Sequence, residues 1–96
     1  MSIEELLRHR RREILQIAEK HGSSNVRVFG SCARHEANAK SDVDLLIDLD
    51  SGRSLLDQVA LKQELEELLG LSVDVVVEGG ISPHLEQRIL VEALPL

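Results

Sequence analysis

Two aspartates separated by one residue, Asp42 and Asp44, are the clearest candidates for chemistry in this chain of 96 residues. They open a run of apolar residues that is typical of a β-strand, so both carboxylates point to one face. Their Cα atoms are then roughly 6.5 to 7 Å apart. Taken alone, such a pair more often marks exposed acids at the start of a strand. A divalent cation would relieve their mutual repulsion, because carboxylate oxygens are preferred ligands of Mg²⁺.

A glycine and a serine at the end of an earlier strand form the second candidate feature, Gly30-Ser31. Gly30 has no Cβ, so a phosphate could approach its backbone closely, and the Ser31 hydroxyl could donate a further hydrogen bond. A short helix expected over residues 32–37 would add backbone N–H groups and its dipole. Arg34, further along, could contact a phosphate or form a surface ion pair. An anion site beside a metal site suits a nucleoside triphosphate bound to magnesium.

A third acid, Asp74, lies within a strand otherwise made of valines. An unpaired buried aspartate is costly, so Asp74 lies either at a sheet edge or in the metal site. If its strand is next to that of Asp42 and Asp44, the three acids can complete a two-metal arrangement, with ions about 3.5 to 4 Å apart. Asp74 could also accept the proton of an acceptor hydroxyl as a general base.

These residues together resemble the signature of the DNA polymerase β-like nucleotidyltransferase superfamily, G-S-x10-D-x-D. Here Gly30-Ser31 is followed, after ten residues, by Asp42-Val43-Asp44. The fuller text, VFGSCARHEANAKSDVDLLI, is similar to the minimal nucleotidyltransferase branch. The resemblance covers almost the whole chain, because VDVV around Asp74 stands where that family has its third aspartate.

The resemblance implies a mixed sheet flanked by helices. It also implies that Asp42, Asp44 and Asp74 bind Mg²⁺, while Gly30-Ser31 holds the triphosphate of ATP. Many members of the family resemble antitoxins that pair with a helical HEPN toxin, a ribonuclease, and transfer AMP to one of its tyrosines. The chain departs from the family at His35, where glycine is frequent.

Periodicity and breaker residues place all of these groups on one small α/β (α+β) domain covering residues 1–96. The expected order is helix, strand, helix, strand, helix, strand, helix. The helices are predicted over residues 2–21, 32–37, 54–69 and 83–92, and the strands over residues 26–29, 42–49 and 72–77. The strand over residues 42–49 is almost continuously apolar after Asp44, which indicates a central strand covered on both faces.

Composition excludes some function classes. The net charge is -6 and the isoelectric point is about 5.1, which argues against a nucleic-acid-binding module. Phe29 is the only aromatic residue, so no platform exists for stacking bases. The basic run over residues 9–12 indicates a solvated helix face or a patch for an acidic partner. One cysteine, Cys32, and the lack of a signal-peptide pattern favour the cytoplasm.

Three functions compete. An enzyme could transfer a nucleotidyl group to a partner protein, because the chain has no tyrosine of its own and no second domain to hold a large acceptor. A binding module could instead neutralise a toxin by contact alone, using the outer faces of its first and last helices. A nucleotidyltransferase with a small-molecule acceptor ranks third, because enzymes of that kind usually carry an additional domain.

Overall fold

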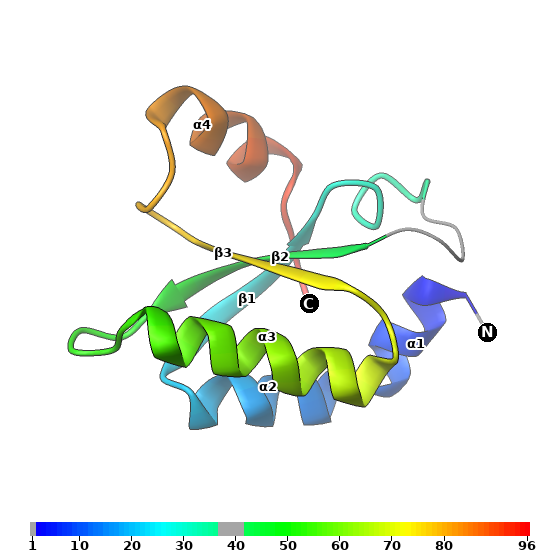
Figure 1. Ribbon diagram of the computed structural model, residues 1–96. Helices are drawn as coiled ribbons and strands as arrows, with labels where there is room; N and C mark the ends of the chain where they lie inside the picture. The colour runs from blue at the N-terminus through cyan, green and yellow to red at the C-terminus, as the bar shows by residue number, and fades with distance from the viewer. Residues whose placement is uncertain (1, 37–41) are drawn as a thin grey trace.

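The computed structural model describes residues 2–36 and 42–96, in which a four-stranded mixed sheet is the central layer (Figure 1). Its strand order is β3-β2-β1-β4, with β2 antiparallel to β1 and parallel to β3. The predicted mixed sheet is therefore confirmed, and β2 is a central strand as expected. The strands are β1 (Ser23–Phe29), β2 (Val43–Leu49), β3 (Val73–Val77) and β4 (Leu94–Pro95).

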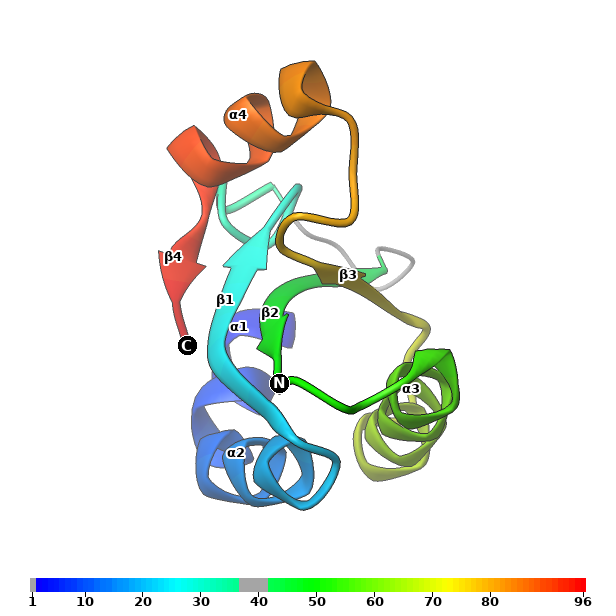
Figure 2. The ribbon, with the colours of Figure 1, turned by 90° about the vertical axis from the view of Figure 1, so that its left-hand side faces the viewer.

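Helices lie on both sides of this sheet. One face is covered by α2 (Arg11–Lys20) and α3 (Leu55–Leu69). The short helix α1 (Ile3–His9) precedes α2 and lies at its N-terminal end. Figures 1 and 2 show α4 (Pro83–Glu92) standing on the opposite face. No helix in the described part of the chain is long and apolar enough to cross a membrane.

Alternation along β2 divides its side chains between the two faces. Val43, Leu45 and Ile47 belong to the main core and are at most 1% exposed. Asp44 and Asp48 therefore point to the other face, the side of α4. The core on the helical side is aliphatic and gathers residues from α1, α2, α3 and the sheet, among them Leu7, Ile14, Ala18, Val28, Leu61, Leu65, Val73 and Val75.

The single long helix predicted at the start of the chain is wrong, since α1 and α2 are separate. Arg10 lies between them with φ −99° and ψ 8°. Residues 8–12 carry no apolar side chain, so nothing in this stretch holds the helix against the core. The chain can therefore change direction there, and each helix buries its own pair of apolar residues on the sheet, Ile3 and Leu7 in α1 and Ile14 and Ala18 in α2.

The short helix predicted over residues 32–37 is also not formed as a helix. A single turn closes from the Gly30 carbonyl to the Arg34 N–H, at 3.1 Å. It then ends in a Schellman motif, because the Glu36 N–H donates to the Ser31 carbonyl and His35 adopts a left-handed conformation with φ +59°. Glycine is favoured in this conformation, which explains why glycine is frequent in the family at the position where this chain has His35. Ala37 lies outside the described residues.

Two further differences concern the strands. The strand predicted over residues 26–29 begins earlier, at Ser23, and this first part of β1 pairs with the end of β2. The pairing contains an irregularity between Ser24 and Arg27. Asn25 accommodates it with φ +50°. The two-residue strand β4 was not expected, because it contains Pro95 and proline rarely occurs within a sheet. Proline is tolerated there since β4 is an edge strand, and Leu94 pairs with Val28 of β1.

Replacing His35 tests the left-handed position. We expect His35→Gly to be more stable than His35→Ala by about 1 kcal/mol, because only glycine adopts this conformation without strain. Both variants lose the exposed contact of His35 Nδ1 with Glu4 Oε1, 2.9 Å in the native protein, so that contact cancels in the comparison. Urea denaturation followed by circular dichroism measures the difference. Equal stability of the two variants would contradict a strained His35.

Candidate active site

The parallel pairing of β2 with β3 brings two of the three predicted acids together. Asp44 lies directly opposite Asp74 in the register, on the face that α4 overlooks. The condition set in the sequence analysis, that the strand of Asp74 lie next to that of Asp44, is therefore met. Burial and, to a smaller extent, the charges of Asp74 and Asp42 together raise the pKa of Asp44 to about 6. A cation bound between two such acids would stabilise their ionised forms.

Gly30 contacts this acid pair directly. It follows the last residue of β1, Phe29, which pairs with Asp44. Gly30 has φ +72°, and a Cβ built on it would lie 2.2 Å from Asp44 Oδ2. Any other residue would therefore displace the carboxylate. The glycine of the predicted phosphate turn is required here both by its own conformation and by the closeness of Asp44.

Asp42 precedes β2 and is exposed. Its carbonyl oxygen lies 3.8 Å from the Cys32 Sγ, which links it to the turn after β1. Cys32 itself is buried, and burial raises the pKa of its thiol. Within residues 2–36 and 42–96, no three His, Cys, Asp or Glu side chains already converge as a metal site. Closing all three aspartates on a cation thus requires side-chain reorientation.

Arg34 points to the same corner, but it is paired with an acid that the sequence did not single out. Its guanidinium donates to Glu92 Oε1 at the end of α4 and to Glu36 Oε2, 3.2 Å away. The other oxygen of Glu92 accepts the Gly30 N–H at 3.0 Å. One carboxylate thus bridges two donors that the sequence assigned to phosphate. With no helix after Gly30, the expected dipole contribution is absent from this corner.

A cleft of about 1020 Å³ lies between the exposed sheet face and α4. Gly30, Arg34, Asp44 and Asp74 line it, whereas Ser31 is not among the described residues that do. The volume is ample for a nucleotide. Its other described lining residues are Phe29, Lys62, Val75, Val76, Ile81, His84, Leu85, Gln87, Arg88, Ile89, Val91 and Glu92.

Lys62 was missed by sequence reasoning. It is part of α3, on the other side of the sheet, and reaches the cleft at the edge strand β3. A hydrogen bond to Glu66 raises its pKa, and the charges of Asp74 and Asp42 act in the same direction. Its position in the amphipathic pattern of α3 gave no signal, because a lysine on a helix is usually a solvated surface residue.

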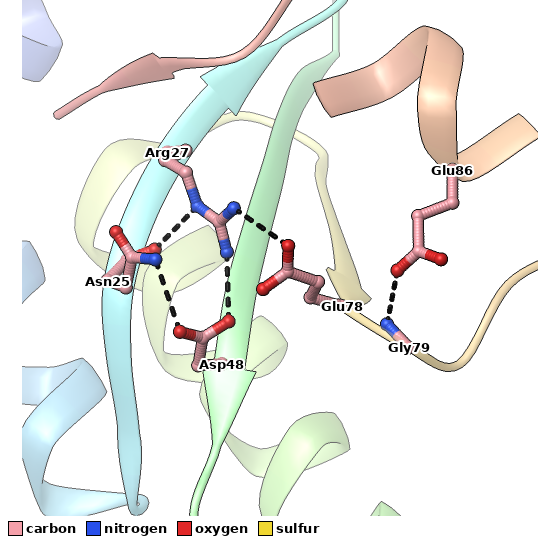
Figure 3. Close-up of polar contacts among 6 residues, drawn as sticks. All are labelled: Asn25, Arg27, Asp48, Glu78, Gly79 and Glu86. Carbon is pink, nitrogen blue, oxygen red and sulfur yellow. Dashed lines mark hydrogen bonds and ion pairs between the residues drawn. The ribbon is translucent and has the colours of Figure 1, made fainter. Parts of the chain in front are cut away.

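The opposite end of the same strands also carries two acids, Asp48 and Glu78, but there both form ion pairs with an arginine. Arg27 of β1 forms ion pairs with Asp48 and Glu78 (Figure 3). Its Nη2 lies 3.0 Å from Asp48 Oδ1, and its Nη1 lies 3.5 Å from Glu78 Oε1. Asn25 adds a hydrogen bond of 3.1 Å to Asp48. The pKa of Asp48 is lowered: slight burial acts to raise it, but these hydrogen bonds and the charge of Arg27 outweigh that effect.

The contrast between the two ends identifies the unusual one. Asp48 and Glu78 follow Asp44 and Asp74 by four residues each, so both ends of the β2–β3 pair bear two acids. Among the described residues, no lysine or arginine forms an ion pair with Asp44 or Asp74 within 4.0 Å. In residues 2–36 and 42–96, nothing gives the acid pair in the cleft the compensation that Arg27 supplies at the other end.

Comparison with known proteins agrees with this arrangement of fold and cleft. Residues 11–96 match the model of the nucleotidyltransferase domain family, and the chain belongs to that family. It is an enzyme of the nucleotidyltransferase kind. A Methanocaldococcus jannaschii protein named provisionally as protein adenylyltransferase MJ0435 is 49% identical over 84 residues, which cover 88% of this chain and 90% of the relative.

Other relatives place the chain within the minimal branch of the family. The protein adenylyltransferase MntA of Thermococcus cleftensis is 38% identical over 82% of this chain and 80% of its own length. A solved structure described provisionally as a minimal nucleotidyltransferase is 50% identical, with a TM-score of 0.89 over 100% of this chain and 97% of that one. A toxin–antitoxin complex with AMP-PNP shares the fold, with a TM-score of 0.76 at 20% identity over 88% of this chain and 69% of that one.

Replacing Asp44 tests the cost of the uncompensated acids. The folded protein holds the Asp44 proton up to about pH 6, whereas an ordinary aspartate releases it near 3.8. The folded state therefore binds more protons in this window, and its stability falls as the pH rises through it. In EDTA at about pH 7.5, we expect Asp44→Asn to raise the melting temperature by roughly 4 to 8 °C, on the order of 1 kcal/mol after allowance for solvent screening.

The matched control is Asp48→Asn on the same strand, which removes a partner of Arg27 and should lower the melting temperature. At about pH 3.5 the advantage of Asp44→Asn should be nearly lost, because the native aspartate is then mostly protonated in both states. Thermal unfolding at the two pH values measures each effect. An Asp44→Asn variant less stable than the native protein at about pH 7.5 would contradict the predicted cost of the charge.

Proposed function

We propose that this enzyme transfers AMP from ATP to a hydroxyl group, most readily a tyrosine, of a partner toxin of the HEPN kind, and that it requires Mg²⁺. The main support is the acid pair Asp44 and Asp74, uncompensated by any described cation and adjacent to a glycine whose backbone a phosphate can approach. The names of the relatives support adenylyl transfer to a protein. Solved toxin–antitoxin complexes with the same fold support a toxin as the acceptor.

The proposed roles follow from position. Asp42, Asp44 and Asp74 would hold Mg²⁺, which supplies neutralisation of the triphosphate charge and of the pyrophosphate that leaves. Gly30 and Arg34 would bind phosphate oxygens through the backbone N–H and the guanidinium. The same role for Ser31 requires its hydroxyl to turn toward the cleft, since its carbonyl is already used by the turn.

Asp74 would also act on the acceptor, because it is exposed on the edge strand β3. The acceptor oxygen attacks the α-phosphorus of ATP, and the bond from that phosphorus to the bridging oxygen of the β-phosphate breaks. Pyrophosphate leaves, and the hydroxyl proton passes to the Asp74 carboxylate. Catalysis then depends mainly on positioning of the reacting groups and on charge neutralisation.

The acceptor surface would come from the partner. The chain contains no tyrosine, so it cannot be its own substrate at that residue type. The cleft opens between α4 and the β3 edge, and a tyrosine of a docked protein could reach Asp74 from this side. A protein acceptor therefore agrees better with this small domain than a small molecule that would need a pocket of its own.

Labelled ATP provides a direct test. The protein is incubated with ATP carrying label on the α-phosphate, Mg²⁺ and the toxin encoded beside its gene. We expect label on the toxin, at least 100-fold less after EDTA or in the double variant Asp42→Asn with Asp44→Asn, because positioning and charge neutralisation are both lost. Asp50→Asn, an exposed acid outside the cleft, is the matched control and should retain the transfer.

The outcomes separate the competing functions. Absence of label on a soluble toxin would reject adenylyl transfer to that protein. If the double variant still suppresses the toxicity of the partner in cells, contact alone is sufficient and the binding-module alternative gains support. Label transfer that persists in EDTA would contradict the need for a divalent cation.

A further inference from the structure

Glu92, the last residue of α4, occupies the corner of the cleft where the proposed function places a phosphate. Its Oε2 accepts the Gly30 N–H at 3.0 Å, and its Oε1 is paired with the Arg34 guanidinium. These contacts join residues 62 and 58 positions apart in the chain. A carboxylate and a phosphate present similar oxygens to N–H donors, so both anions can use the same two groups.

We propose that Glu92 is an intramolecular substitute for a phosphate group, which occupies the Gly30 N–H and the Arg34 guanidinium when no nucleotide is bound and which ATP must displace. This inference rests on the proposed function, because it takes Gly30 and Arg34 as triphosphate ligands. It adds that the apparent affinity for ATP is reduced by competition within the chain. Release of Glu92 would accompany binding.

The attachment of α4 allows such a displacement. Ile89 is its one buried residue, and Leu85 and Val91 are exposed at 47% and 85%. Gly79-Gly80 lie in the loop before the helix, and only Ala93 separates the helix from the short strand β4. Its side chains therefore hold it to the sheet through few interactions, and the Glu92 contacts are a large part of them.

The negative charge of Glu92 allows its role as a phosphate substitute to be distinguished from a permanent role in the ATP site. The carboxylate of Glu92 adds a negative charge that acts on Asp44, which already lies beside Asp74. A triphosphate that arrives with Mg²⁺ brings its own cation, whereas Glu92 brings none. If Glu92 instead served to orient Arg34 for ATP, removing its charge would weaken binding. The two roles thus predict opposite changes in affinity.

The test compares two glutamates of α4 that each accept a glycine N–H. Glu92→Gln removes the charge paired with Arg34. Glu86→Gln is the matched control, because Glu86 accepts the Gly79 N–H at 2.6 Å (Figure 3) and is not among the described residues that line the cleft. Titration calorimetry with ATP and Mg²⁺ should give a Kd roughly 10-fold lower for Glu92→Gln, equivalent to about 1.4 kcal/mol. The Glu86→Gln variant should bind like the native protein.

A second variant guards against misfolding. Glu92→Asp keeps the charge but is shorter by one methylene, so it cannot reach both donors, and we expect a smaller gain in affinity. Circular dichroism confirms that each variant folds. Equal or weaker binding by both Glu92 variants, with native binding intact, would overturn this inference and leave the proposed function standing. Failure of every form to bind ATP would overturn both.

Discussion

The register between β2 and β3 is the constraint on which the rest of the cleft depends. It places Asp44 and Asp74 opposite each other, and it is fixed by the aliphatic side chains on the other face of the same strands. A slip of one residue would turn Val43 and Val73 out of the core. The burial of the valines therefore holds two like charges side by side, and the free energy of that repulsion is available to favour a bound cation.

The helix α4, above the sheet, makes polar contacts near both of its ends. Glu86 accepts a hydrogen bond from the backbone of the loop after β3, near Asp48 and Glu78, while Glu92 contacts Gly30 and Arg34 in the cleft. The first of these contacts is a local helix-to-loop link, seven residues apart. The second contact joins residues that are 62 positions apart in the sequence. The structure thus combines a fixed charge network at one end of the face with an exchangeable one at the other.

Much of this arrangement is predictable from local pattern. The β2 strand, α3 with Ser54 at its N-cap, and α4 all fall where periodicity and capping residues place them, within a residue or two. The face shared by Asp42 and Asp44 stays a prediction from alternation, because Asp42 precedes the first residue of β2. The roles of the three aspartates, of Gly30 and Ser31 and of Arg34 stay predictions.

Features that depend on distant parts of the chain could not be predicted in the same way. The break at Arg10 depends on how two helices pack on the sheet. The strand β4 exists only because β1 offers a free edge. Glu92 carries no signal in its own neighbourhood, since its partners Gly30 and Arg34 are about two thirds of the chain away. His35 was recognised as a departure, but its cause, a left-handed backbone, became visible only in the turn itself.

Phe29, which lines the cleft beside Gly30, has an optical consequence. It is the only aromatic residue, since the chain contains neither tryptophan nor tyrosine. The protein is therefore almost transparent in the near ultraviolet, where adenine and the tyrosines of other proteins absorb. A spectrum of the purified protein reports directly on any nucleotide or partner that accompanies it. A tryptophan introduced at position 29 would be a single fluorophore located at the cleft.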